Sequence, residues 1–258
     1  FGVDPPPPPG WNGVGWFRIR LALDADVATH PVAMWTRQSG ASEVYVDVRL
    51  VQSDGVVGRD YESERPYLQV GYEGTRATLV ALSAGPHTVA VRYSNFTAAR
   101  RQHMEAVGFV LHVGDLDAMA ASQQPRRLAA VTQVGFTVAS LTFAVLHLAL
   151  FVFYPRIRQN LYFAATTACW AALTFLDYKQ QRTHDIDTHL ALFGALRVAI
   201  VLVSGGMLLF TYSIFRQRPP RYFVWFMAVC GLTAVPAVVW PVATFGWVNI
   251  VAMAALAE

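Results

Sequence analysis

The spacing of hydrophobic positions changes near the middle of this chain. Between residues 11 and 115, apolar and polar residues alternate in short segments, whereas long uninterrupted apolar runs begin at residue 128. A period of two is typical of strands with one buried face, and long apolar runs are typical of helices that cross a membrane. The pattern therefore predicts an all-β N-terminal domain followed by an α-helical transmembrane bundle.

Four segments of the N-terminal half carry this alternation most clearly. Turn residues such as Ser39-Gly40 and Asp54-Gly55 separate them. Their apolar sets are Phe17, Ile19, Leu21 and Leu23; Val44, Val46 and Val48; Val89, Val91 and Tyr93; and Phe109, Leu111 and Val113. About eight such strands in about a hundred residues predict a two-sheet sandwich or jelly roll around one core.

The first apolar run, residues 128–154, has no acidic or basic side chain except His147. As a helix it is roughly 40 Å long, against a hydrocarbon core of about 30 Å. Core helices of soluble proteins seldom stay apolar on every face for so long, which disfavours that alternative. Further runs predict helices at residues 161–178, 190–215, 222–240 and 242–258, of which the last is incomplete. We expect a stem at residues 116–127 and an extended Pro-rich lead-in at residues 1–10.

Arginines predict the orientation of the bundle. The first short loop carries Arg156 and Arg158, and the third carries three more arginines, whereas acidic residues offset the basic ones in the second loop. By the positive-inside rule the first and third loops are cytoplasmic, which leaves the N-terminal domain outside. Arg126 and Arg127 argue for the opposite, but long N-terminal domains translocate with little regard to charge. The arginines of the third loop are Arg216, Arg218 and Arg221.

Composition narrows the classes of function. The net charge is +3, without a Lys/Arg run of the kind that binds nucleic acid. Both cysteines, Cys169 and Cys230, fall in predicted helices, so no disulfide is expected in the outer domain. No cofactor is predicted from the sequence. The chain starts at Phe1 and stops within an apolar run, so we expect a fragment of a longer protein.

Three motifs of the outer domain carry a family resemblance. They are GVGWFRIRLAL at residues 13–23, SGASEVYVDVRLV at residues 39–51 and LSAGPHTVAVRYSN at residues 82–95. In this order they resemble the sugar-binding jelly-roll domain of β-galactosidase and β-glucuronidase enzymes, which implies a galactose-binding-like sandwich. Val48 stands where that family has a hairpin glycine, so a bulged turn is expected here in place of a tight type I′ turn.

The junction YPRIRQNLYFA at residues 154–164, after such a domain, resembles the bacterial seven-transmembrane receptors with diverse intracellular signalling modules. The resemblance implies an extracytoplasmic β domain, seven helices, and a cytoplasmic output such as a histidine kinase, diguanylate cyclase or phosphatase. It also implies a multi-pass protein of the bacterial inner membrane with a periplasmic N-terminal domain.

Strand parity brings candidate ligand-binding residues together. Polar and aromatic residues lie at positions opposite to apolar neighbours in three strands: Trp16, Arg18 and Arg20 in the first, Trp35 and Arg37 in the second, and Glu43, Tyr45 and Asp47 in the third. If these strands are neighbours, one face presents Arg18, Trp35, Arg37, Tyr45 and Asp47, a combination suited to carbohydrate or another small ligand. The alternative is that the tryptophans pack in the core and the charges form an ordinary solvated face.

Other ionisable residues are weaker candidates. The acidic residues Asp60, Glu62 and Glu64, with Asp54 nearby, suit a solvated loop or a calcium site better than a glycosidase pair, which needs a fixed carboxylate spacing. His30, His87, His103 and His112 lack the spacing of a zinc site, so no metal site is predicted from them. No catalytic residue is predicted in this chain.

Three ionisable residues stand out within the predicted helices, because such groups are costly in lipid. Asp177 and Arg197 lie toward the same side and could pair, with snorkelling of Arg197 as the alternative. His147 could sense pH or could hydrogen-bond a neighbouring helix, and the structural role is favoured.

Together these features favour a membrane receptor for signal transduction that contacts lipid, a carbohydrate or small-molecule ligand, and a second copy of the chain. The main alternative is a membrane-anchored carbohydrate-processing enzyme whose jelly roll positions substrate. A transporter is a third class, for which Pro236 and the pair Gly205-Gly206 could break helices.

Overall fold

The computed structural model describes residues 10–69, 77–96, 108–215, 223–225, 228–229 and 231–232. The chain forms two compact units. The β unit comprises Phe1–Arg127 and Gln181–Ile186, and the helical unit comprises Leu128–Gln180 and Asp187–Glu258. Several predicted features lie wholly or mostly outside the described residues. These are the Pro5–Pro9 run, His103, the third loop with its arginines, the helices at 222–240 and 242–258, and Pro236.

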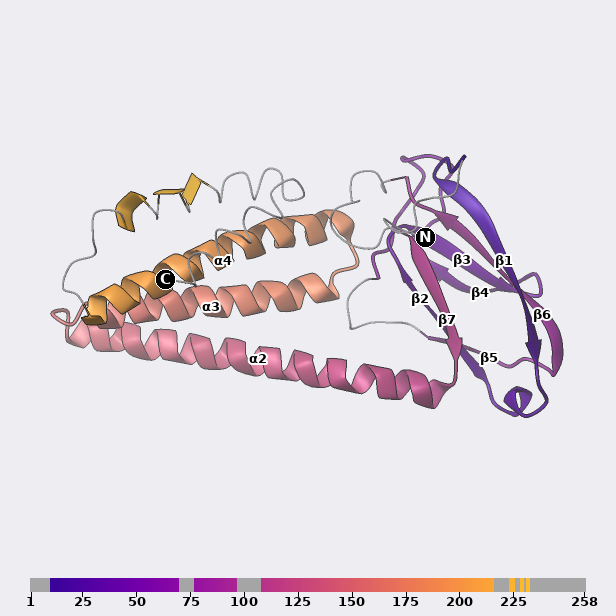
Figure 1. Ribbon diagram of the computed structural model, residues 1–258, viewed down its shortest axis with the longest axis horizontal. Coiled ribbons are helices and arrows are strands. Elements are labelled where there is room, and N and C mark those ends of the chain that lie inside the picture. Colours follow the sequence, from indigo (N-terminus) through magenta and orange to yellow (C-terminus); the bar gives the residue numbers. More distant parts are fainter. Residues whose placement is uncertain are drawn as a thin grey trace. The chain divides into compact units, whose positions relative to one another are not determined.

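The β unit contains two antiparallel sheets (Figure 1). The strands of the larger sheet run in the order β1-β6-β3-β4, and those of the smaller in the order β5-β2-β7. The bounds are β1 Val14–Leu23, β2 Val32–Gln38, β3 Ala41–Val46, β4 Arg49–Asp54, β5 Thr78–Val80, β6 Gly85–Ser94 and β7 Phe109–Gly114, with a short 3-10 helix at Val27–Thr29. The predicted β character of the N-terminal half is confirmed.

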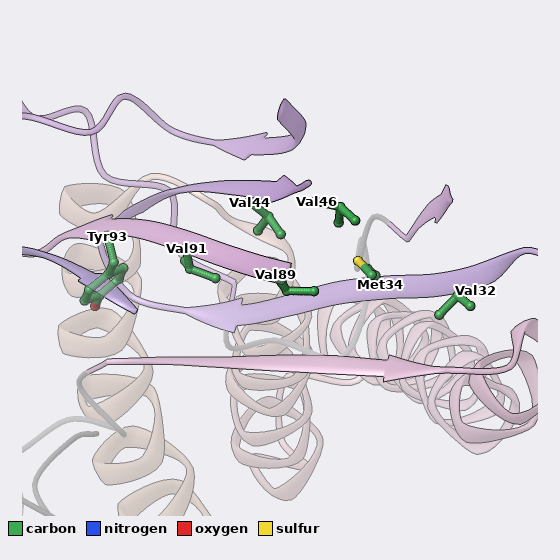
Figure 2. Close-up of a cluster of buried hydrophobic side chains, with 7 residues drawn as sticks. All are labelled: Val32, Met34, Val44, Val46, Val89, Val91 and Tyr93. Carbon is green, nitrogen blue, oxygen red and sulfur yellow. The ribbon is translucent and has the colours of Figure 1, made fainter. Parts of the chain in front are cut away.

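A cluster of buried side chains joins the two sheets. Val32 and Met34 come from the smaller sheet and face residues of β3 and β6 in the larger one, as Figure 2 shows. These residues are Val44, Val46, Val89, Val91 and Tyr93. Most of the predicted alternation therefore marks the inner faces, although Ile19 and Val113 are 56% and 42% exposed.

Ser39 and Gly40 carry the chain from β2 in the smaller sheet to β3 in the larger one. Gly40 has a φ of 120°, and a Cβ atom there would lie 2.3 Å from the carbonyl oxygen of Ser94. Only glycine fits such a conformation and such an approach. The Tyr93 hydroxyl and the Asn95 amide both donate to the Ser39 carbonyl, which fixes the crossing against the C-terminal end of β6.

The hairpin between β3 and β4 corrects one expectation. Val46 pairs with Arg49, so Asp47 and Val48 alone form the loop, and both have positive φ, 47° and 68°. Two consecutive residues of this kind make a type I′ turn, so the expected bulged turn is wrong. The register shifts instead within the strands, between Val44 and Tyr45. Val48 is 97% exposed, and does not share the buried face of Val44 and Val46 as its parity predicted.

Three long helices follow the strands: α2 Leu116–Phe153, α3 Gln159–Arg182 and α4 Ile186–Phe215 (Figure 1). The predicted stem at residues 116–127 forms the first turns of α2. Among the described residues, Leu128–Phe153 and α4 are long and apolar enough to cross a membrane. α4 runs without interruption through Gly205 and Gly206, so the helix break considered there is wrong.

The type I′ turn makes a prediction at Val48. A β-branched residue is strained at φ 68°, and glycine removes that strain at some cost in unfolded-chain entropy. Val48→Gly should therefore stabilise the protein by about 0.5–1 kcal/mol, measured by thermal unfolding of the full chain in detergent. Val110→Gly, at an exposed position of β7, is the control and should destabilise it. Destabilisation by both changes would contradict the turn assignment.

Candidate ligand-binding face

The outer face of the larger sheet gathers aromatic and charged side chains in rows. β1, β6 and β3 are neighbours, and their registers align Trp16 with Arg92 and Arg92 with Glu43. The next row aligns Arg18 with Ala90 and Ala90 with Tyr45. Because side chains alternate along a strand, both rows point away from the buried positions Val89, Val91 and Val44. We call the residues Trp16, Arg18, Glu43, Tyr45 and Arg92 the aromatic face.

Two rings approach each other across the aromatic face. The centroids of Trp16 and Tyr45 lie 5.5 Å apart, with ring planes at 40°, although their strands are separated by β6. In the adjoining row, the β6 residue between Arg18 of β1 and Tyr45 of β3 is Ala90, which has a small side chain. Trp16 remains 55% exposed, so much of its ring is open to solvent. An exposed indole is suited to stacking against the apolar face of a ligand.

A polar network fixes Tyr45. Its hydroxyl donates to Glu43 Oε2 at 2.8 Å, and Arg92 Nη1 donates to the same oxygen at 3.3 Å. The hydrogen bond to the Glu43 carboxylate raises the pKa of Tyr45, so the phenol stays protonated. The other carboxylate oxygen of Glu43 can accept a hydrogen bond from a ligand hydroxyl. The exposed Arg18 can donate to a hydroxyl or an anionic group.

Trp35 and Arg37 do not belong to this face. β2 lies in the smaller sheet, so the expectation that all five candidate residues share one face is wrong. Trp35 is half-buried and stacks on His112, its cross-strand neighbour, with centroids 5.1 Å apart and planes at 10°. Trp35 is therefore neither a core residue nor a neighbour of Tyr45. Arg37 is exposed on the same outer face of the smaller sheet.

Asp47 has a structural role in the hairpin turn. Its Oδ1 accepts the backbone N–H of Thr88 at 2.8 Å, and its Oδ2 lies 2.5 Å from His87 Nδ1. His87 Nε2 lies 2.8 Å from the Ser83 carbonyl, so both ring nitrogens face acceptors and the imidazolium form is favoured. These contacts tie the turn to the start of β6.

The acidic loop is organised by its own hydrogen bonds. Asp60 Oδ1 accepts the backbone N–H and the hydroxyl of Ser63 at 2.8 and 2.6 Å, which lowers the pKa of Asp60. Glu64 is buried, and its two carboxylate oxygens accept the Ser94 hydroxyl and the Phe96 N–H. Within the described part of the chain, no group of three His, Cys, Asp or Glu side chains could hold a metal ion.

Polar side chains of the helical unit join neighbouring helices. Gln133 of α2 donates to Asp177 and to the Thr174 carbonyl of α3, and the Thr137 and Thr174 hydroxyls lie 2.7 Å apart. His147 of α2 lies 3.1 Å from Asn160 Oδ1 of α3, in agreement with the favoured helix-bridging role. Such hydrogen bonds hold helices together where water is absent.

Arg197 is buried within the helical unit, at 2% exposure, and its guanidinium lies 4.2 Å from the Phe193 ring centroid. A buried position inside the bundle differs from the snorkelling alternative, in which the guanidinium would reach the headgroups. A cation over an aromatic ring is a stable arrangement in an apolar setting.

Three members of the aromatic face, Trp16, Glu43 and Arg92, were not among the five predicted site residues. Arg92 lies on β6, where the alternation of apolar residues identified only the core positions. The observation that identifies Arg92 is the pairing of β6 with both β1 and β3. Only this register shows that Arg92 lies between Trp16 and Glu43. No family model matches the chain, and no curated protein or solved structure matches it either.

The His87–Asp47 pair makes a pH prediction. Hydrogen bonding to Asp47 raises the pKa of His87, so its contribution is complete below pH 6.5 and is lost as pH rises through the raised pKa. Hydrogen bonds from Thr88 and His87 lower the pKa of Asp47, so its contribution is present above pH 3.8 and is lost at lower pH. Both contributions coexist between these two values.

Thermal unfolding of the full chain across pH should therefore separate wild type from His87→Gln. We expect the difference in Tm to be largest near pH 5 to 6 and to shrink above it. His30→Gln is the matched control, because the His30 ring lies beside the Thr29 hydroxyl and pairs with no carboxylate among the described residues. A difference that stays constant from pH 5 to 9 would contradict the charged pair.

Proposed function

We propose that this chain is the sensing and membrane-spanning part of a bacterial signal-transduction receptor. Its β unit, a jelly roll of the galactose-binding type, receives an extracytoplasmic ligand. Its helices cross the inner membrane and relay the bound state to a cytoplasmic output module such as a histidine kinase or cyclase. The aromatic face is the observation that carries this proposal, because it joins a half-exposed indole to fixed charged groups.

The chemistry of the aromatic face favours a carbohydrate or a similar polyhydroxylated ligand. Sugars present apolar ring faces to indoles and hydroxyl groups to charged side chains. Trp16 supplies the exposed ring, and Glu43, Arg92 and Arg18 supply an acceptor and donors within two adjoining rows. The exposure of Trp16 disfavours a core role for its indole ring.

The segment that connects α3 to α4 supports the proposal that the β unit transmits ligand binding to the helices. Residues Gln181–Ile186, where α3 ends and α4 begins, belong to the β unit. Within that unit the Leu68 N–H donates to the His184 carbonyl at 2.9 Å, and the His184 ring stacks on Tyr67 at 4.5 Å. A ligand that favours one arrangement of the β unit would therefore act on residues continuous with α3 and α4.

The proposed orientation places the β unit in the periplasm. Arg156 and Arg158, in the short connection between α2 and α3, are exposed and would lie on the cytoplasmic side. The same orientation leaves the α3–α4 connection on the periplasmic side, and support for it comes from the grouping of Gln181–Ile186 with the β unit.

Ligand binding tests the function. With the full chain in nanodiscs and a panel of glycans, we expect Trp16→Ala to lose about 1–3 kcal/mol of binding, or roughly 5- to 150-fold in Kd. Arg37→Ala, an exposed change on the other sheet, is the control and should bind as wild type. Absence of glycan binding by wild type, or a loss in Arg37→Ala alone, would contradict the proposed face.

Cysteine accessibility tests the orientation. In a background with Cys169→Ala and Cys230→Ala, single cysteines are introduced at Arg158 and at Ser53, both exposed. In intact spheroplasts a membrane-impermeant maleimide should label Ser53→Cys and should label Arg158→Cys only after lysis. Labelling of Arg158→Cys before lysis would overturn the orientation.

A further inference from the structure

The end of the core near Asp54 contains a second feature, unrelated to the aromatic face. Oxygen-bearing side chains replace the hydrocarbon that fills the rest of the core. They come from β2, β3, β4 and the residue Gln69, and all are at most 7% exposed. We call them the oxygen cluster; its members are Thr36, Gln38, Ser42, Gln52, Asp54 and Gln69.

Asp54 is the centre of the oxygen cluster. Its Oδ2 accepts the Thr36 hydroxyl at 2.7 Å and the Gln52 amide at 2.6 Å, and its backbone carbonyl accepts the Gln38 amide at 3.2 Å. Asp54 is 3% exposed, and within the described residues it pairs with no cationic side chain. A buried carboxylate without a counter-charge is costly, and such groups in proteins are usually paired or bound to a metal ion.

The orientations of the two glutamine amides follow from their surroundings. Gln38 Nε2 faces two carbonyl oxygens, those of Gly40 and Asp54, and Gln52 Nε2 faces the Asp54 carboxylate and the Thr36 hydroxyl. Rotating either amide would set oxygen against oxygen. The Oε1 atoms of both glutamines are consequently fixed as acceptors, and neither has a hydrogen-bond partner among the described residues.

Ser42 adds a third such oxygen. It pairs with Asp54 in the β3–β4 register, and its buried hydroxyl also lacks a hydrogen-bond partner in the part of the chain that the structure describes. One formal negative charge and three unpartnered oxygens therefore occur in one cluster. A water molecule would satisfy the oxygens but would leave the charge uncompensated, whereas one cation satisfies both.

We propose that the oxygen cluster binds a hard, oxygen-preferring cation, Ca²⁺ or Na⁺. Carboxylate, amide and hydroxyl oxygens are the ligands these ions prefer, and the absence of sulfur and imidazole from the cluster disfavours zinc. Asp54 ends β4 next to the exposed Ser53, which brings the cluster close to the surface of the unit. The ion would link β2 of one sheet to β3 and β4 of the other.

Calorimetry and thermal unfolding of the full chain in detergent test this site. The protein is stripped with chelator in choline chloride and titrated separately with CaCl₂ and with NaCl. We expect one saturable site per chain and a Tm that rises with the bound ion. A response to Ca²⁺ alone or to Na⁺ alone identifies the ion. No heat and no change in Tm with either salt would mean that water alone fills the cluster and would overturn the proposal.

Variants locate the site. Asp54→Asn and Gln52→Met should each weaken cation binding at least about tenfold, because the first removes the negative charge of the site and the second removes an oxygen ligand. Asp60→Asn, which alters an exposed carboxylate outside the cluster, is the control and should bind as wild type. If Asp54→Asn does not fold, Gln52→Met and Gln38→Met decide the result. Wild-type affinity in both of these variants would equally overturn the assignment.

Discussion

The register of β1, β6 and β3 is the constraint on which most of the β unit depends. Antiparallel pairing aligns every residue of one strand with a fixed partner on the next, and alternation sends neighbours to opposite faces. The row containing Phe17, Val91 and Val44 therefore points into the core, and the adjoining row of Trp16, Arg92 and Glu43 points outward. A slip of one residue would exchange the two rows, burying charges and exposing the core. The stability of the core thus maintains the geometry of the candidate site.

The interior of the β unit is not uniformly apolar. Toward Val32 and Val46 it is packed with hydrocarbon, whereas toward Gln38 and Asp54 it consists of hydrogen-bonded polar groups. Such a network stabilises one arrangement only if each buried group finds a partner, because the low dielectric penalises every unpaired one. The cation proposed for the oxygen cluster would supply the missing partner and explain why this end of the core tolerates a buried carboxylate.

The helical unit uses polar groups in a different way. Where the surroundings are lipid, apolar contacts between helices contribute little beyond their packing, and hydrogen bonds such as Gln133 to Asp177 select which faces meet. The costly ionisable groups lie at such contacts or, like Arg197, inside the unit. The receptor function proposed above needs helices that can change arrangement, and a few polar contacts are easier to exchange than a continuous apolar interface.

The local pattern of apolar and polar residues was sufficient to predict which parts of the chain form strands and which form helices. Alternation of Val89, Val91 and Tyr93 predicts a strand, and the apolar run from residue 128 predicts a long helix, because each depends only on the period of one segment. The tertiary structure alone decided which strands are neighbours. It assigned β2 to the other sheet, which separates Trp35 from Tyr45, and it brought Arg92 between Trp16 and Glu43. Pairing joins residues dozens of positions apart, and no local period records it. The type I′ turn at Val48 also escaped local reasoning, because the pairing of Val46 with Arg49 imposes a conformation that valine alone would avoid.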